Sequence, residues 1–179
     1  MPPHERRAWL ARMTGGTERT ARLILRRPRL DDTPALFAFM GDAAAMRWTH
    51  VHAAPRDLRR YLAGHECQRR RIGFGPWTVI ERASGAIVGF GGLYDDPFDL
   101  GWGLEVGYFF APAVWGRGYG RELVARALEV AFAAGVAEVR AFAHPGNIGS
   151  QKVLERSGFR RLRYVPEMDR FLYACPRPD

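Results

Sequence analysis

Apolar and polar positions near the start of the chain switch from the period of a strand to that of a helix. Residues 21–27, ARLILRR, alternate in a way that predicts a strand. The stretch that follows, DDTPALFAFMGD, predicts a helix, because acidic capping residues come first, Pro34 falls in the first turn and Gly41 provides a stop.

A second helix is predicted over residues 55–71. Its larger apolar and aromatic positions, together with one histidine, share a single face: Leu58, Tyr61, Leu62 and His65. Most of its arginines fall elsewhere. The run Arg69-Arg70-Arg71 is expected to be a solvated helix end that complements the negative pole of the helix.

The rest of the chain is richer in strands. The segment 75–96 contains two β-rich runs around Ala-Ser-Gly, which predicts an antiparallel hairpin. The further elements expected are a strand over 104–110, a helix from a glycine-rich loop to about 134, a strand over 137–144, a short helix over 147–158, and two strands over 159–165 and 169–175. The order β-αα-βββ-α-β-α-ββ predicts an α/β (α+β) fold, with helices on both faces of a mixed, mostly antiparallel sheet.

Length and composition indicate the domain organisation. With 179 residues, 47% hydrophobic and 26% charged, the chain is expected to form a single domain over 19–179. The basic segment 1–18 lacks an apolar core, so we interpret it as a flexible tail and not as a signal peptide. No apolar run approaches the ~20 residues that cross a bilayer, so no membrane partner is expected. Cys67 and Cys175 fit no metal or redox spacing and are expected to be plain thiols in a reducing cytoplasm.

The net charge of +8 narrows the range of partners. Lys152 is the only lysine, so arginine carries nearly all the positive charge. A basic surface attracts anions such as phosphorylated ligands, RNA or acidic proteins. No nucleic-acid-binding motif accompanies the charge. We therefore favour a genome-wide preference for arginine codons, and not nucleic-acid binding, as the reason for the positive charge.

A loop with three glycines, WGRGYG at 115–120, precedes the helical segment RELVARAL. The first amides of a helix have no partner within it, and Ser, Thr, Asp or Asn usually caps them. None of these residue types is present here, so the amides are expected to face an external anion, which the helix dipole also favours. Glycine permits close approach of a phosphate, and Arg117 and Arg121 add positive charge. The loop is therefore predicted to hold a phosphate.

Two common phosphate-binding motifs do not fit this loop. A dinucleotide-binding fold needs G-x-G-x-x-G directly after a strand, with an acid closing the second strand. Here five residues intervene after the strand, and Glu138 opens the next strand instead of ending it. The Walker pattern G-x-x-x-x-G-K-[ST] is absent.

The loop instead resembles the pyrophosphate loop of the GNAT superfamily of acyl-CoA-dependent N-acyltransferases, Q/R-x-x-G-x-G/A. Trp115 replaces the first Q/R, as in the branch resembling ribosomal-protein N-terminal (alanine/serine) acetyltransferases. Further segments are similar to that branch: TERTARLILRRPRLDD, EVGYFFAPAVWGRGYG, HPGNIGSQKVLERSGF and DRFLYA. The resemblance runs from about Thr17 to Ala174.

The resemblance implies where acetyl-CoA binds. In the family, free amides of the strand before the loop bind the pantetheine arm and the thioester carbonyl, and a fixed N–H there stabilises the oxyanion that forms. Asn147 matches the asparagine that contacts the pantetheine arm, although it also suits a helix N-cap. No metal is implied. The implied cofactor-binding residues are Phe109, Phe110, Ala111, Trp115, Gly116, Arg117, Gly118, Tyr119, Gly120, Arg121, Asn147, Ser150 and Lys152.

The resemblance also implies a base and an acid. Glu105, on the strand that leads to the loop, is the expected general base, with a water as relay; the alternative is an ordinary acid on a half-exposed strand. Ser150 matches a serine found near the thiol in this branch. Where many relatives carry a tyrosine acid this chain has Leu154, which leaves Ser150, a tyrosine such as Tyr164, or water as the acid.

Other polar residues mark the expected acceptor side. His50 and His52 are further candidates for proton transfer, although such a pair in a loop is more often simply surface. Asp95, Asp96 and Asp99 would attract a cationic amine, although Asp, Pro and Gly are equally typical of a solvated turn.

These patterns together predict an N-acetyltransferase that moves an acetyl group from acetyl-CoA to a primary amine by direct attack in a ternary complex. The acceptor is either a protein N-terminus or a small molecule, and a monomer or homodimer is expected. The alternatives are a transferase with a longer acyl chain or a hydroxyl acceptor, and a non-catalytic CoA-binding or RNA- or ribosome-associated protein.

Overall fold

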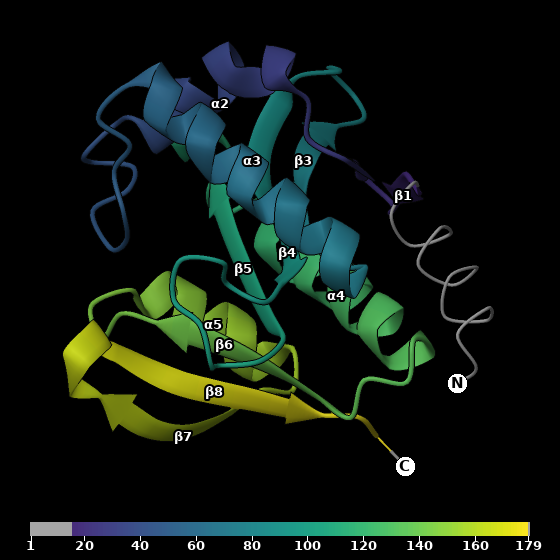
Figure 1. The fold of residues 1–179 in the computed structure, drawn as a ribbon. Coiled ribbons are helices and arrows are strands. Elements are labelled where there is room, and N and C mark those ends of the chain that lie inside the picture. Colours follow the sequence, from purple (N-terminus) through teal and green to yellow (C-terminus); the bar gives the residue numbers. More distant parts are fainter. Residues whose placement is uncertain (1–15, 179) are drawn as a thin grey trace.

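The structure, a computed structural model, describes residues 16–178 (Figure 1). The predicted tail over 1–18 lies outside the described residues except for its last part, 16–18. Within that part Glu18 belongs to a short strand, and its carboxylate forms an ion pair with Arg126 at 2.6 Å. Glu18, which the prediction placed in the tail, is therefore part of the sheet.

Every helix and strand predicted from the sequence is present, and the first short strand is an addition. The strands are β1 (Glu18–Arg19), β2 (Leu23–Arg26), β3 (Pro76–Glu81), β4 (Ile87–Tyr94), β5 (Glu105–Phe110), β6 (Glu138–Ala143), β7 (Arg160–Val165) and β8 (Arg170–Pro176). The α-helices are α2 (Thr33–Met40), α3 (Pro55–Ile72), α4 (Tyr119–Ala133) and α5 (Ile148–Arg156). Short 3-10 turns cover Leu30–Asp32, Pro112–Val114 and Pro166–Met168.

The strands form one sheet in the order β1-β2-β3-β4-β5-β6-β8-β7. All neighbouring strands run antiparallel except β5 and β6, which are parallel. Helices α2 and α3 pack on one face of this sheet, and α4 and α5 pack on the other (Figure 1). The predicted mixed, mostly antiparallel α/β fold is confirmed.

Two apolar cores hold these layers together. The larger core lies between the sheet and α4 and α5, and includes the fully buried Leu123, Val124 and Tyr173. The smaller core lies beneath α2 and α3, and includes Leu36 and Leu58. Each helix thus buries its apolar stripe against the sheet, as the period of its sequence predicts.

Asp32 has a different role from the predicted one. It precedes α2, but its side chain makes no capping hydrogen bond to that helix. Its buried carboxylate instead accepts two hydrogen bonds from Arg26, one from the Thr78 hydroxyl and one from the Arg29 amide. Burial raises the pKa of this carboxyl, but these hydrogen bonds outweigh burial and leave the pKa below its ordinary value. The residue therefore joins β2 to β3.

The prediction for the three arginines at the end of α3 is wrong at one position. Arg70 and Arg71 are exposed as expected, but Arg69 is buried. Its guanidinium donates to the carbonyl oxygen of Pro76 and lies 3.3 Å from a carboxylate oxygen of Glu66. Gly75 leaves the space that it fills, because a β-carbon there would lie 2.8 Å from the centre of the guanidinium.

Candidate active site

A divergence between β5 and β6 provides the space for a site in the middle of the sheet. The two strands pair only at Glu105 and Arg140, where the Arg140 amide donates to the Leu104 carbonyl at 2.9 Å. Beyond this pair they separate, and β6 continues with β8 and β7 in a different direction from β1 to β5 (Figure 1). The backbone of β5 is therefore open on one edge after Glu105.

The register with β4 determines which amides of β5 face that open edge. The Ala111 amide already donates to the Val88 carbonyl at 2.9 Å, and the pairing of β4 with β5 is continuous. Hydrogen-bonding direction alternates along an antiparallel strand, so the Phe109 amide also faces β4, whereas the Tyr108 and Phe110 amides face the opening. Phe109 and Ala111 were predicted to offer free amides to the donor, but their amides face β4. The Phe110 amide faces the opening, as predicted. The Tyr108 amide faces it too, although Tyr108 was not among the predicted residues.

The glycine loop has the conformation that its sequence predicts. Gly118 is the N-cap of α4, and no side chain caps the helix there. Gly116 and Gly118 have φ angles of +75° and +81°, which other residues rarely adopt. The first amides of α4 are consequently presented to the outside, with the positive end of the helix dipole behind them.

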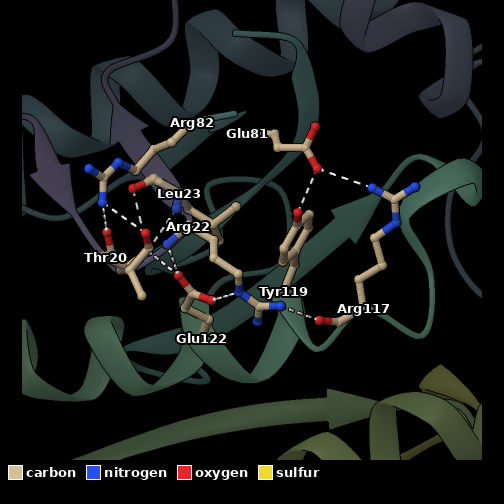
Figure 2. A network of polar contacts seen from close by, with 9 residues as sticks. Thr20, Arg22, Leu23, Glu81, Arg82, Arg117, Tyr119 and Glu122 are labelled. Atoms are coloured by element: carbon tan, nitrogen blue, oxygen red, sulfur yellow. Dashed lines mark hydrogen bonds and ion pairs between the residues drawn. The ribbon is translucent and has the colours of Figure 1, made fainter. Parts of the chain in front are cut away.

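The side chains of the loop are largely engaged with the protein itself (Figure 2). Arg117 forms an ion pair with Glu81 at 3.2 Å, and the buried Tyr119 donates its hydroxyl hydrogen to the same carboxylate at 2.5 Å. The Trp115 indole donates to the Phe110 carbonyl at 2.8 Å. Arg121 is exposed on the first turn of α4. The backbone of the loop, more than its side chains, is thus available to an anion.

Helix α5 brings further predicted residues to the same opening. Asn147 caps α5, because its side-chain oxygen accepts from the Ser150 amide at 3.1 Å. The Ser150 hydroxyl lies 3.0 Å from the hydroxyl of Tyr108 on β5. Lys152 is exposed, whereas Leu154 is buried in the core.

Tyr164 lies in another hydrogen-bonding network. Its hydroxyl donates to Asp169 at 2.7 Å, and the other oxygen of that carboxylate lies 3.1 Å from His144 Nε2. The hydroxyl hydrogen of Tyr164 is therefore already committed to a carboxylate at the end of the β7–β8 pair, which argues against this tyrosine as the acid.

Glu105 is the most perturbed carboxylate near the opening. It is only 6% exposed, so the alternative of a half-exposed acid does not hold. Burial, and next the negative charges of Asp96, Asp99 and Asp95, raise its pKa to about 8, while Arg140 opposes the shift. A carboxyl group that titrates near neutral pH suits a general base.

An aromatic cluster borders Glu105 on the face of the sheet that carries α3. Tyr61 and Phe98 stack with ring centroids 5.5 Å apart, and the ring of His65 lies edge-on to Tyr61 and Tyr94 at 4.5 and 4.9 Å. Gly64 makes this packing possible, because a β-carbon there would lie 2.5 Å from the Phe98 ring. The helical spacing of Tyr61 and His65 predicted that these two residues share a face. No local sequence pattern indicated that Tyr94, at the end of β4, and Phe98 would pack against them.

The histidines of this region differ in exposure. His50 is exposed, as expected for a loop, whereas His52 is buried and lies against His50 and Tyr61 at centroid distances of 5.0 and 4.8 Å. His65 is only 2% exposed, and neither ring nitrogen has a hydrogen-bond partner among the described residues. Burial, and next the charge of Arg69, lower the pKa of His65 to about 3.

The described residues contain neither a metal-binding cluster nor a membrane-spanning helix. Among residues 16–178, no group of three or more His, Cys, Asp or Glu side chains is arranged to hold a metal ion. In the same part of the chain, no helix combines the length and the apolar character that spanning a membrane requires.

Similarity to known proteins agrees with this geometry. The family model described as "Acetyltransferase (GNAT) domain" matches residues 22–160. The uncharacterized protein YkkB of Bacillus subtilis is 26% identical over 141 residues, which are 78% of this chain and 82% of that protein.

Solved structures share the fold. The ribosomal-protein-S5-alanine acetyltransferase of Vibrio fischeri superposes with a TM-score of 0.71 at 17% identity, covering 92% of this chain and 98% of that chain. RimJ of Mycobacterium smegmatis, solved in complex with CoA-disulfide, superposes with a TM-score of 0.70 at 22% identity. The match covers 86% of this chain and 81% of that chain. Since the family match spans most of the sequence, the protein belongs to the acetyltransferase (GNAT) family and is an acyltransferase.

Proposed function

We propose that this protein transfers an acetyl group from acetyl-CoA to a primary amine by direct attack in a ternary complex, with Glu105 as general base. The observation that carries the proposal is the position of Glu105. Its buried carboxyl group, with a pKa raised to about 8, lies where β5 leaves β6 and borders the aromatic cluster.

The donor site is proposed on the open edge of β5 and the start of α4. The amides of Gly118 and the first turn of α4 would hold the pyrophosphate, and the Tyr108 and Phe110 amides would bind the pantetheine arm and the thioester carbonyl. RimJ of Mycobacterium smegmatis binds a CoA derivative on the same fold, which supports a CoA site here.

The base acts on an amine that arrives as a cation. An α-amine titrates near 7.7–8.0 in water, so a carboxylate with a similar pKa can accept its proton, directly or through a water. Asp96 and Asp99 lie close enough to raise the pKa of Glu105, and their negative charge would attract the cation before the proton is removed.

The acid is proposed to be Ser150, with the hydroxyl of Tyr108 as the hydrogen-bond partner that holds its side chain in place. The leaving thiolate needs a proton donor, and Leu154 offers none. The Ser150 and Tyr108 hydroxyls lie 3.0 Å apart between α5 and β5, so one can hold the other in place while it donates.

The acceptor is proposed to be a protein N-terminus or a small amine. The Vibrio fischeri relative acts on a ribosomal protein, as its name states, which supports the first class. The aromatic cluster, in which Phe98 is exposed, together with the exposed Leu100, favours an amine that carries an apolar group.

The two cysteines are free, as a reducing cytoplasm would leave them.

Free-thiol release from acetyl-CoA tests this function against a panel of N-terminal peptides, arylalkylamines, polyamines, aminoglycosides and amino acids. Amine-dependent release that Glu105→Gln abolishes would support the proposal. Tight CoA binding without release for any amine class would instead indicate a non-catalytic CoA-binding protein.

A further inference from the structure

Arg22 contacts the glycine loop from the β2 side (Figure 2). Its Nη1 donates to the carbonyl oxygen of Arg117 at 2.7 Å, and its guanidinium lies 4.7 Å above the centre of the Tyr119 ring. Its Nη2 lies 3.4 Å from the point where a β-carbon of Gly118 would be. One side chain thus touches three consecutive residues of the loop.

The Arg117 carbonyl is the informative contact. This carbonyl and the N–H of Gly118 belong to one planar peptide group, and no described residue has a cis peptide bond. In a trans peptide the C=O and the N–H point in opposite directions. By holding the carbonyl on the β2 side, Arg22 therefore directs the Gly118 N–H away from itself, toward the proposed phosphate site.

The backbone of the loop has few contacts of its own that could fix this orientation. Gly116 and Gly118 both have positive φ, and glycine backbones lose much conformational entropy when they become ordered. The hydrogen bond from the Arg117 amide to the Val114 carbonyl is long, at 3.4 Å. Glu81 restrains the side chains of Arg117 and Tyr119, and the contact from Arg22 adds a direct restraint on the peptide itself.

Glu122 fixes Arg22 in turn. Its carboxylate accepts from Arg22 Nε at 2.7 Å, from the Arg22 amide at 2.7 Å and from the Thr20 hydroxyl at 2.5 Å. Burial raises the pKa of Glu122, but the hydrogen bonds from Thr20 and Arg22 together outweigh burial and leave the pKa below its ordinary value. Arg22 and Glu122 neutralise each other, so the pair contributes position more than net charge.

We propose that Arg22 is a positioning residue for the pyrophosphate loop: it holds the peptide between Arg117 and Gly118 so that the Gly118 amide faces the donor. This role rests on the proposed function, since it requires that the loop bind CoA. It assigns a use to the segment before β2, about a hundred residues away from the loop in sequence.

Calorimetric titration of the full chain with CoA and with dephospho-CoA tests the role in three variants. Arg22→Gln removes the contacts, and Arg22→Lys keeps the charge but cannot bond Glu122 and Arg117 in the same planar geometry. Arg82→Gln is the matched control, because Arg82 lies beside Arg22 but donates to the Thr20 and Ala21 carbonyls and not to the loop (Figure 2).

We expect R22Q to weaken CoA about tenfold or more, since hydrogen bonds to charged groups are of that size. R22K should lose nearly as much affinity for CoA as R22Q. The affinity for dephospho-CoA should fall by the same factor as that for CoA. The CoA affinity of R82Q should stay within about twofold of that of the wild type. All variants should unfold cooperatively within a few degrees of the wild type.

Three results would overturn the role. Unchanged affinity in R22Q would show that the loop does not need the contact. A loss for CoA that disappears with dephospho-CoA would make Arg22 a direct ligand of the 3′-phosphate. An equal loss in R82Q would show general anchoring of the first strands. Absence of CoA binding in the wild type would be a separate failure, that of the donor site itself.

Discussion

The hydroxyl oxygens of Tyr108 and Ser150 lie 3.0 Å apart and connect β5 to α5. Tyr108 is also the residue whose amide faces the opening between β5 and β6. Burial raises the pKa of Tyr108 to about 12, although its hydrogen bond with Ser150 opposes this shift. The phenol therefore stays protonated near neutral pH and can act as a hydrogen-bond partner for Ser150.

If Tyr108 holds Ser150 in place, the two residues act as one unit. Tyr108→Phe and Ser150→Ala should each lower kcat several-fold, and the double variant should be no slower than the slower single variant. Turnover rates at saturating acetyl-CoA measure this. Independent, multiplicative losses would show that the two hydroxyls serve separate purposes.

Glu105→Gln should lower kcat by about a hundredfold, a typical contribution of a general base. The dissociation constant of CoA should not change, because the donor contacts lie on the loop and on the open edge of β5. Glu129→Gln, at a side chain that is 64% exposed on α4, is the matched control and should behave as the wild type.

The pH dependence of the same variant is a separate prediction. The pKa of Glu105 is raised to about 8, so the carboxylate form that accepts a proton becomes populated as the pH rises through that value. The wild-type rate should therefore rise with pH up to about 8, and the inflection should be lost in Glu105→Gln. A profile that is identical in both proteins would exclude Glu105 as the base.

Much of the fold was predictable because it depends on local patterns. Apolar periodicity identified the elements, and the absence of a capping residue before α4 identified the orphan amides around Gly118. The orientation of the β5 amides was not predictable in this way. It depends on the register of Ala111 with Val88, which sequence spacing does not contain.

Side chains that meet distant residues were the hardest to place. Arg69 has the sequence context of a solvated helix end, but it is buried because Gly75 leaves space and Pro76 offers a carbonyl. The partnership of Arg22 with Arg117 has the same origin, since β2 and the loop become neighbours only in the folded sheet.

Gly118→Ala should weaken CoA binding about tenfold, because a β-carbon disfavours the φ of +81° with which the N-cap presents the first amides of α4, and it would lie 3.4 Å from Arg22 Nη2. Gly135→Ala is the control, since Gly135 has a φ of +84° with nothing within 4 Å of its β-carbon position. The two variants should be destabilised similarly in thermal unfolding. If calorimetry gave the same CoA affinity for Gly118→Ala as for Gly135→Ala, the loop would not be part of the donor site.

His65→Phe should stabilise the protein at low pH. The pKa of His65 is about 3 in the folded state and near 6.5 when unfolded, so the unfolded state binds the extra proton as the pH falls below 6.5. This costs the wild type about 2 kcal/mol at pH 5, which the variant should not lose. Chemical denaturation of both proteins at pH 5 and 7 measures the difference; the same pH dependence in both would contradict the buried neutral imidazole.

The most direct test of the proposed donor site is a titration of the isotopically labelled protein with CoA, followed by amide proton–nitrogen NMR. We expect the largest shifts at saturation at the amides of Gly118, Gly120, Tyr108 and Phe110, while the Ala111 amide, already bonded to Val88, should move little. Shifts centred elsewhere, with the glycine loop unmoved, would contradict the proposed donor site.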